Sequence, residues 1–123
     1  MNNITLSALP KTWIIDVDGT IVEHNGYLKG EDKLLDGVID FFSKITPKDK
    51  VILTTSRQKK YEADLKKFLK KFNLRYDEII FDLPFGERIL INDKKLSGLK
   101  TAYAINKDRD APLLVNFSID ENL

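Results

Sequence analysis

The chain has 123 residues, of which 42% are hydrophobic and 32% charged, with a formal net charge of +1. This composition predicts one globular domain over residues 1–123, and the balanced charge disfavours intrinsic disorder and nucleic-acid binding. The absence of cysteine excludes a disulfide framework, a thiolate zinc site and a cysteine nucleophile. Because the sequence shows neither a signal-peptide pattern nor an apolar run of about 18 residues, we expect a cytoplasmic protein without a membrane span.

Apolar runs and helical spacings alternate along the first part of the chain. Residues 13–17 form a short apolar run ending in Asp-Gly, which predicts a buried strand followed by a turn. Residues 34–45 carry hydrophobic side chains at three- and four-residue spacing, which predicts an amphipathic helix. Residues 51–53 predict a second strand, and residues 61–72 predict a second helix that stops at Asn73.

The remaining part of the chain contains further strand candidates. Residues 76–81 and 89–91 predict strands, residues 102–105 are a candidate central strand, and residues 113–119 are either an edge strand or a partner-binding tail. The connection at 82–88 is too short for a helical crossover between parallel strands, so we expect a turn there. The alternation predicts an α/β fold with a mainly parallel central sheet and a ligand site beyond the carboxyl ends of its strands.

Two carboxylates separated by one residue follow the first strand, in the segment Asp-Val-Asp-Gly-Thr at residues 16–20. Asp16 and Asp18 leave the same side of an extended chain, so they are able to share a hard cation such as Mg²⁺, which prefers oxygen ligands. Gly19 allows backbone amides to approach a phosphate. Taken alone, the same residues also suit an Asp-Gly turn that ends a strand.

The segment 16–20 after an apolar strand resembles the first motif of the haloacid dehalogenase superfamily. The resemblance implies that Asp16 is a nucleophile that forms an aspartyl phosphate and that Asp18 is the general acid and base. It places Gly19 and Thr20 among the substrate-binding residues. It also implies a three-layer Rossmann-like fold with a minimal cap, and a phosphatase that depends on Mg²⁺.

Residues 51–57, Val-Ile-Leu-Thr-Thr-Ser-Arg, resemble the second motif of the same family. There, a hydroxyl residue at the end of a strand donates a hydrogen bond to the transferring phosphoryl group. Thr55 is the first candidate for this role, and Thr54 and Ser56 are alternatives. Arg57 belongs to the same neighbourhood, where a helix start attracts anions.

Residues 89–95, Ile-Leu-Ile-Asn-Asp-Lys-Lys, resemble the fourth family motif, in which an acidic residue completes the metal site. The resemblance implies that Asp93 joins Asp16 and Asp18 around Mg²⁺. Many members of the family have a second acidic residue nearby, whereas two lysines follow Asp93 in this chain. The implied metal shell therefore holds more water.

The third family motif is usually a lysine that holds the nucleophile and the phosphate. Small relatives often have Lys-Pro where this chain has Leu83 and Pro84. Arg88, Lys94 and Lys95 are the candidates for the missing positive charge. Arg88 is preferred because a guanidinium group holds phosphate in a planar fork.

Two further polar loops contain candidate substrate contacts, although both also suit ordinary surface loops. His24 lies where the family has a mobile flap, and Arg109 lies in a charged loop after a candidate strand. Only a helix and a strand fit between the first loop and Thr55, so the large cap domain of many relatives is missing. Capless relatives often act on bulky substrates or use a neighbouring subunit as a lid, which is compatible with a homo-oligomer.

The resemblance covers residues 12–106 and implies hydrolysis of a small-molecule phosphate monoester. Association with small capless relatives puts a phosphosugar of surface-polysaccharide biosynthesis first among the substrate classes. One alternative is a nucleotide or nucleic-acid-end phosphatase, which requires a continuous basic track into the site. The other is a non-catalytic binding or regulatory domain that has lost the third motif.

Overall fold

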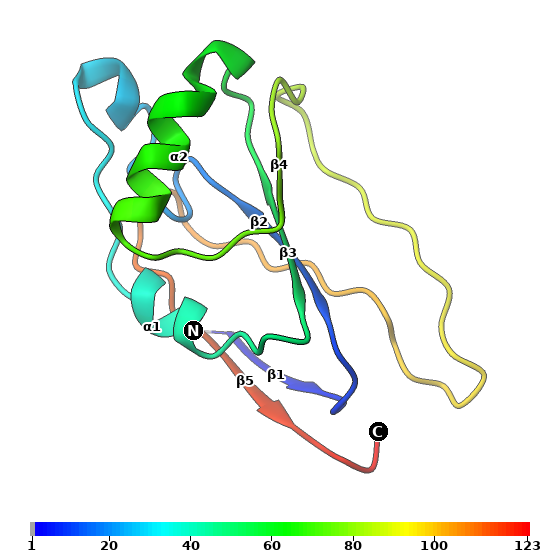
Figure 1. Cartoon of the computed structure of the whole chain (residues 1–123). Coiled ribbons are helices and arrows are strands. Elements are labelled where there is room, and N and C mark those ends of the chain that lie inside the picture. The colour runs from blue at the N-terminus through cyan, green and yellow to red at the C-terminus, as the bar shows by residue number, and fades with distance from the viewer. Residues whose placement is uncertain (1) are drawn as a thin grey trace.

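The computed structural model describes residues 2–123 as an α/β fold with two parallel sheets. Its elements in chain order are β1 (Asn2–Leu6), β2 (Thr12–Asp16), the 3-10 helix η1 (Gly26–Lys29), α1 (Val38–Ser43), β3 (Lys50–Thr54), the 3-10 helix η2 (Lys59–Tyr61), α2 (Glu62–Lys71), β4 (Glu78–Ile80) and β5 (Val115–Ile119). β2, β3 and β4 form one sheet, and β1 pairs with β5 in the other (Figure 1). No helix of residues 2–123 has the length and apolarity needed to cross a membrane.

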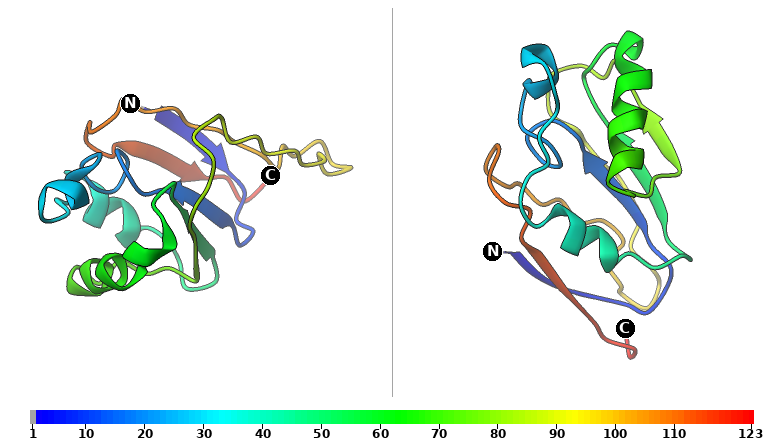
Figure 2. Two further views of the ribbon diagram at one scale, coloured as in Figure 1. Left: turned by 90° about the horizontal axis from the view of Figure 1, so that it is seen from above. Right: turned by 60° about the vertical axis from the view of Figure 1, so that its left-hand side comes forward.

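The three-stranded sheet brings the carboxyl ends of its strands together. β2 and β3 pair in parallel from Thr12 opposite Lys50 to Asp16 opposite Thr54, and β4 follows on the other side of β3. α1 and α2 connect these strands and lie on one side of the sheet (Figure 2). Because parallel strands end at the same edge, Asp16 and the residues after Thr54 emerge close to each other.

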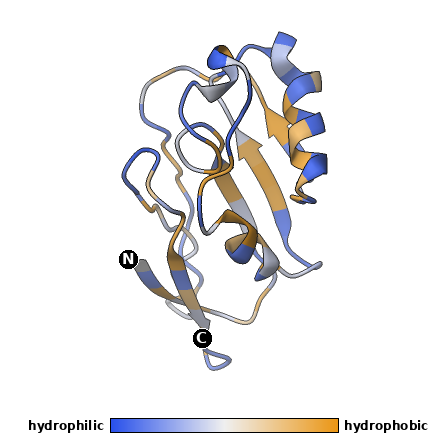
Figure 3. Cartoon of the chain, turned by 90° about the vertical axis from the view of Figure 1, so that its left-hand side faces the viewer, coloured by the Kyte–Doolittle hydropathy of each residue, from blue (hydrophilic) through white to orange (hydrophobic). Residues whose placement is uncertain are grey.

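The hydrophobic core lies between this sheet and the two helices. Figure 3 shows hydrophobic strands and an α2 of mixed character, as expected for an amphipathic helix that packs on one face of a sheet. The aromatic ring of Trp13 extends the core to the second sheet, with centroid distances of 5.5 Å to Phe41 and 5.2 Å to Phe117. Other buried members from the chain around the sheet and from the helices are Ile15, Val17, Val51, Leu53, Val38, Leu65 and Leu69.

The strands predicted at residues 13–17 and 51–53 are confirmed as β2 and β3. The predicted helix over residues 61–72 is confirmed as α2, and Asn73 just beyond it has a left-handed φ of 53°. β4 occupies only the centre of the strand predicted at residues 76–81. Local hydrophobic patterns were sufficient to predict these elements, because each element packs its apolar side chains against an element that is close to it along the chain.

α1 begins later than the helix predicted over residues 34–45. Gly37 has a φ of 83°, and a side chain there would clash with the carbonyl oxygen of Leu113. Only glycine fits this turn without strain, so the helix begins at the next residue. Leu34 is instead extended and forms an antiparallel bridge with Val22.

The predictions for the last third of the chain are correct only at its end. Residues 113–119 contain β5, an edge strand whose partner β1 was not predicted. The strands expected at 89–91 and 102–105 are wrong, since residues 82–112 contain no helix or strand and run as a long extended excursion (Figure 1). Ile89 and Ile91 are 82% and 87% exposed. A run of three apolar residues does not by itself select a partner strand.

Candidate active site

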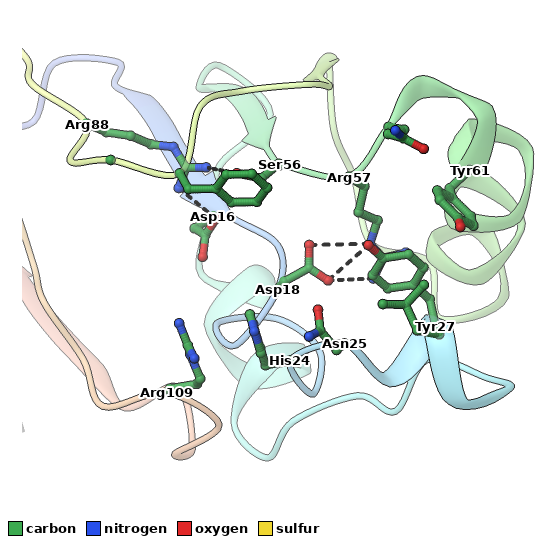
Figure 4. Close-up of a pocket in the computed structure, with 14 residues that line it drawn as sticks. Asp16, Asp18, His24, Asn25, Tyr27, Ser56, Arg57, Tyr61, Arg88 and Arg109 are labelled. Carbon is green, nitrogen blue, oxygen red and sulfur yellow. Dashed lines mark hydrogen bonds and ion pairs between the residues drawn. The ribbon is translucent and has the colours of Figure 1, made fainter.

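A pocket of about 420 Å³ opens beyond the carboxyl ends of β2 and β3 (Figure 4). Its volume lies within the range of small-molecule sites. The residues around it come from the end of β2, the segment after β2 with η1, the segment after β3 with η2, and the excursion after β4. They are Asp16, Asp18, His24, Asn25, Tyr27, Leu28, Ser56, Arg57, Gln58, Tyr61, Phe85, Gly86, Arg88 and Arg109.

Asp16 is the last residue of β2, and its carboxylate is accessible from the pocket. Arg88 Nη1 donates a hydrogen bond to Asp16 Oδ1 over 2.8 Å, and the Thr20 hydroxyl donates to Asp16 Oδ2 over 3.2 Å. The side chains of Asp16 and Arg88 are 35% and 40% exposed. Burial raises the pKa of Asp16 above its ordinary value, and the charge of Arg88 and its hydrogen bond act against that rise.

The turn after Asp16 is held by the loop at residues 107–110. Gly19 has a φ of 83°, and a Cβ there would lie 3.1 Å from Arg109 Cγ. The Gly19 carbonyl oxygen accepts hydrogen bonds from Lys107 Nζ at 2.8 Å and from the Asp110 amide at 3.0 Å. Gly19 therefore allows close packing of the loop that brings Arg109 to the pocket.

Asp18 is held by Arg57 and Thr55, which follow β3. Arg57 Nε and Nη2 donate to Asp18 Oδ1 over 3.0 and 2.9 Å, and the Thr55 hydroxyl donates to Asp18 Oδ2 over 2.8 Å. Thr55 is fully buried and does not line the pocket. The structure thus places the predicted Thr55 hydroxyl against Asp18 and not in the cavity.

Arg57 also binds a second carboxylate. Its Nη1 and Nη2 donate to Asp32 over 3.0 and 2.6 Å, and its guanidinium carbon lies 4.0 Å from the centre of the Tyr27 ring. Although burial lowers the pKa of Arg57, the hydrogen bonds that Arg57 donates to Asp32 and Asp18, together with their negative charges, outweigh burial and raise that pKa. Arg57 is therefore a fixed cation already committed to two aspartates, whereas the sequence suggested a free anion-binding residue.

Sequence analysis missed Asp32 and Tyr27 because nothing in their spacing distinguishes them from a polar loop. They lie in and after η1, and they reach Arg57 only through the folding of this loop over the strand ends. The side chain of Asp32 is 5% exposed. A buried charge normally requires a partner, so the presence of Asp32 explains how Arg57 is tolerated at 2% exposure.

Ser56 faces the pocket where Thr55 does not. Its hydroxyl oxygen lies 3.5 Å from Arg88 Nη2 and also 3.4 Å from the Pro84 carbonyl oxygen. Arg109 and His24 likewise line the pocket, as the sequence suggested. Arg109 forms no ion pair with any residue in the described range 2–123, so its charge is available to an anion.

Asp93 does not join the pocket, and neither does Lys94. Within residues 2–123, no group of three or more His, Cys, Asp or Glu side chains is placed to hold a metal ion, so the expected convergence of Asp16, Asp18 and Asp93 is not found. The reason lies in the preceding segment. Residues 89–91 do not add a strand beside β2, so the excursion carries both side chains into solvent.

The site combines an accessible carboxylate, a second carboxylate two residues further along, and nearby positive charge. Such a pocket is able to bind an anionic group beside a carboxylate. A scan against protein-family models finds no match for the chain, and searches of curated proteins and of solved structures find no significant match.

Proposed function

We propose that the chain is a phosphomonoester hydrolase of the haloacid dehalogenase type, with Asp16 as the nucleophile. The observation that supports this proposal most is the position of Asp16, at the end of a parallel strand with its carboxylate open to a pocket and 2.8 Å from Arg88. A carboxylate attacks phosphorus effectively when cationic groups hold the phosphoryl oxygens beside it.

Arg88, Arg109 and Ser56 are the proposed ligands of the phosphoryl group. All three line the same pocket as Asp16. A guanidinium group donates two parallel hydrogen bonds to phosphate, and a serine hydroxyl adds a third donor. Because the Arg88–Asp16 pair is more than one-third exposed, a phosphate is able to replace part of the contact at little cost.

The proposed reaction has two steps. In the first, an Asp16 oxygen attacks phosphorus, the phosphorus–ester oxygen bond breaks, and the leaving oxygen takes a proton from Asp18. In the second, Asp18 accepts a proton from water as the water oxygen attacks phosphorus and the bond between phosphorus and the Asp16 oxygen breaks, which releases inorganic phosphate, regenerates Asp16 and leaves Asp18 protonated for the next cycle. Arg57 and Thr55 fix the direction of the Asp18 carboxylate through both steps.

Mg²⁺ is the cation that we propose for this site. Asp16 and Asp18 both border the pocket, with side chains 35% and 14% exposed. Mg²⁺ is commonly bound by one or two carboxylates, with water and phosphate oxygens completing its shell, so the donor set fits without a third acidic residue. When bound, the ion would neutralise charge on the transferring phosphoryl group.

A phosphate-release assay on phosphosugars and nucleotides, with Mg²⁺ and with excess EDTA, tests the proposal. We expect hydrolysis that requires Mg²⁺, and a phosphoryl adduct on Asp16 detectable by mass spectrometry after rapid quenching. No release from any ester would reject the phosphatase and favour a binding domain of the same fold. Undiminished Mg²⁺-dependent release by an Asp16→Asn chain would reject Asp16 as the nucleophile.

Asp93→Asn is the matched control for the carboxylate assignments. From its place outside the pocket, we expect this chain to keep its activity and its dependence on Mg²⁺. A large increase in the Mg²⁺ concentration needed for activity would show that residues 89–93 fold back beside β2 in solution.

A further inference from the structure

The two ends of the pocket differ in chemistry (Figure 4). Asp16 and Arg88 lie at one end, while Tyr27 and Tyr61 lie at the other, with Asp18 between them. The two tyrosine rings pack edge to face, with centroids 4.8 Å apart and an interplanar angle of 73°. The proposed function uses only the charged end, so the aromatic end has no assigned role.

Both tyrosine rings are held in place by the surrounding structure. Tyr27 belongs to η1 and stacks on the buried Arg57 guanidinium, and Tyr61 ends η2, where its amide donates to the Gln58 carbonyl oxygen over 3.0 Å. Leu28, the residue after Tyr27 in η1, also lines the pocket and is 59% exposed. A rigid aromatic wall binds a ligand with little loss of side-chain entropy.

The position of Asp18 gives the pocket a direction. A general acid must face the leaving oxygen, so the leaving group extends from the phosphoryl group past Asp18 and toward the tyrosines. We propose that the wall formed by Tyr27 and Tyr61 binds the alcohol portion of the substrate, and that this alcohol carries a ring. The inference rests on the proposed function for the order of groups along the pocket.

A ring fits this end of the pocket for two reasons. Tyrosine faces and edges pack against flat or apolar ring surfaces, which a short acyclic alcohol does not offer. The neighbouring His24, Asn25 and Gln58 side chains also line the pocket and supply hydrogen-bonding groups around such a ring. Sugars and aromatic rings share this chemistry, so the experiment must compare one ester of each kind with an acyclic ester.

Isothermal calorimetry in an Asp16→Asn background separates binding from turnover. The probes are glucose 6-phosphate, phenyl phosphate and glycerol 3-phosphate, each with Mg²⁺. We expect at least one ring ester to bind about tenfold more tightly than glycerol 3-phosphate. Preference for glucose 6-phosphate alone identifies a sugar site, and preference for phenyl phosphate alone identifies an aromatic one. Equal affinities for all three esters would overturn the inference.

Substitution of the wall identifies its contribution. Tyr61→Leu keeps apolar bulk without the ring, and we expect it to reduce the ring preference to about one- to twofold. Tyr103→Leu is the control, because Tyr103 is 44% exposed and lies outside the pocket, so it should leave the preference intact. Equal weakening of all three esters by Tyr61→Leu would indicate a purely structural role and reject the inference.

Two further measurements make the test decisive. If Tyr61→Leu strongly lowers the melting temperature, the binding measurement is repeated with Leu28→Ser, because Leu28 is exposed. We expect this variant to reduce the preference for ring esters by about twofold, which is less than the effect expected of Tyr61→Leu. Unaltered preference in both variants would reject the tyrosine end as the site of recognition. If the chain prefers ring esters but the unmodified chain hydrolyses none of them, the phosphatase proposal is rejected and the ring-binding site is retained. If the unmodified chain hydrolyses esters but shows no preference for rings, only the ring-binding site is rejected.

Discussion

Two arginine–aspartate pairs meet at the same pocket but lie in very different surroundings. In the pair from the packed part of the chain, Arg57 Nη2 lies 2.9 Å from Asp18 Oδ1, and the two side chains are 1% and 14% exposed. In the other pair, Arg88 from the excursion lies 2.8 Å from Asp16, and the side chains are 40% and 35% exposed. The distances are nearly equal, so distance does not distinguish the roles of the two pairs.

Burial does distinguish them. A buried pair is costly to break because it leaves an uncompensated charge, whereas an exposed pair contributes little because water solvates both partners. The Arg57–Asp18 pair is therefore suited to fixing a side chain, and the Arg88–Asp16 pair is suited to exchanging partners with a ligand. A similar contrast separates residues 11–81, which supply most of the buried core together with Leu113 and Val115, from residues 82–112, none of which is buried.

The largest effect on activity should come from replacing Asp16, the carboxylate of the exposed Arg88–Asp16 pair. Asp16→Asn should lower kcat by about 10⁴-fold or more, because an amide is a poor nucleophile. Burial raises the pKa of Asp16 in the folded state. At a pH above that pKa, the ionised carboxylate therefore lowers the stability of the folded protein relative to the unfolded chain. The variant should therefore keep its fold at neutral pH. Steady-state kinetics together with urea denaturation check both statements, and an unfolded variant would contradict the second.

Breaking the buried pair should mainly affect stability. Arg57→Met leaves Asp18 and Asp32 without their shared cation, and we expect the free energy of unfolding to fall by about 3–5 kcal/mol. Lys66→Met is the matched control, because it removes a cation from an exposed pair with Glu62 and should cost about 1 kcal/mol or less. Urea denaturation of both variants measures the contrast. Similar small losses would show that the Arg57 cluster is solvated.

Removing the cation of the exposed pair should mainly affect catalysis. Arg88→Met should lower kcat/KM by about 10²- to 10³-fold and change the free energy of unfolding by less than about 1 kcal/mol. Because Arg88 lowers the pKa of Asp16, its loss should raise that pKa and move the acid limb of the pH–rate profile to higher pH. Arg88→Lys keeps the charge and should restore most of the limb. An acid limb that stays in place in Arg88→Met would contradict the pairing.

The smallest effect is expected within the excursion itself. Ile91→Ser should change the free energy of unfolding by about 0.5 kcal/mol or less, because the side chain is 87% exposed. Leu53→Ala, at a fully buried position of β3, should cost about 2–5 kcal/mol. Thermal or urea unfolding compares the two. A loss at Ile91 as large as that at Leu53 would show that this segment is buried in solution.

The sequence predicted the parts of the fold that depend on local patterns. β2 and β3 coincide with short apolar runs, and α2 repeats its apolar residues at helical spacing, so both kinds of element were visible without knowledge of their partners. The proximity of Asp16 and Arg88 was also expected, because the third motif of the family that the sequence resembles supplies a positive charge beside the first aspartate, and Arg88 was preferred for it over Lys94 and Lys95. Their chemical roles stay predictions.

The remaining features depend on contacts between distant parts of the chain. The Arg57–Asp32 pair joins a strand end to a loop without any repeated spacing, and β1 pairs with β5 across almost the whole chain. The prediction for Asp93 required residues 89–91 to find an edge of the sheet, which their composition alone does not determine. A single sequence therefore predicts that a segment forms a strand or a helix, but it does not predict which distant segment that strand or helix contacts.

The pairing of β1 with β5 also affects how the protein acquires its structure during synthesis. Asn2 in β1 lies opposite Val115, so β1 has no partner until the residues of β5 leave the ribosome. At roughly 5–20 residues per second, this delay is on the order of ten seconds. β2, β3, β4 and their helices are complete much earlier in the chain, so they are able to form during that time. Pairing with β5 is therefore the last of these contacts to become possible during synthesis, and until it occurs β1 is an unpaired strand that chaperones or other nascent chains are able to bind.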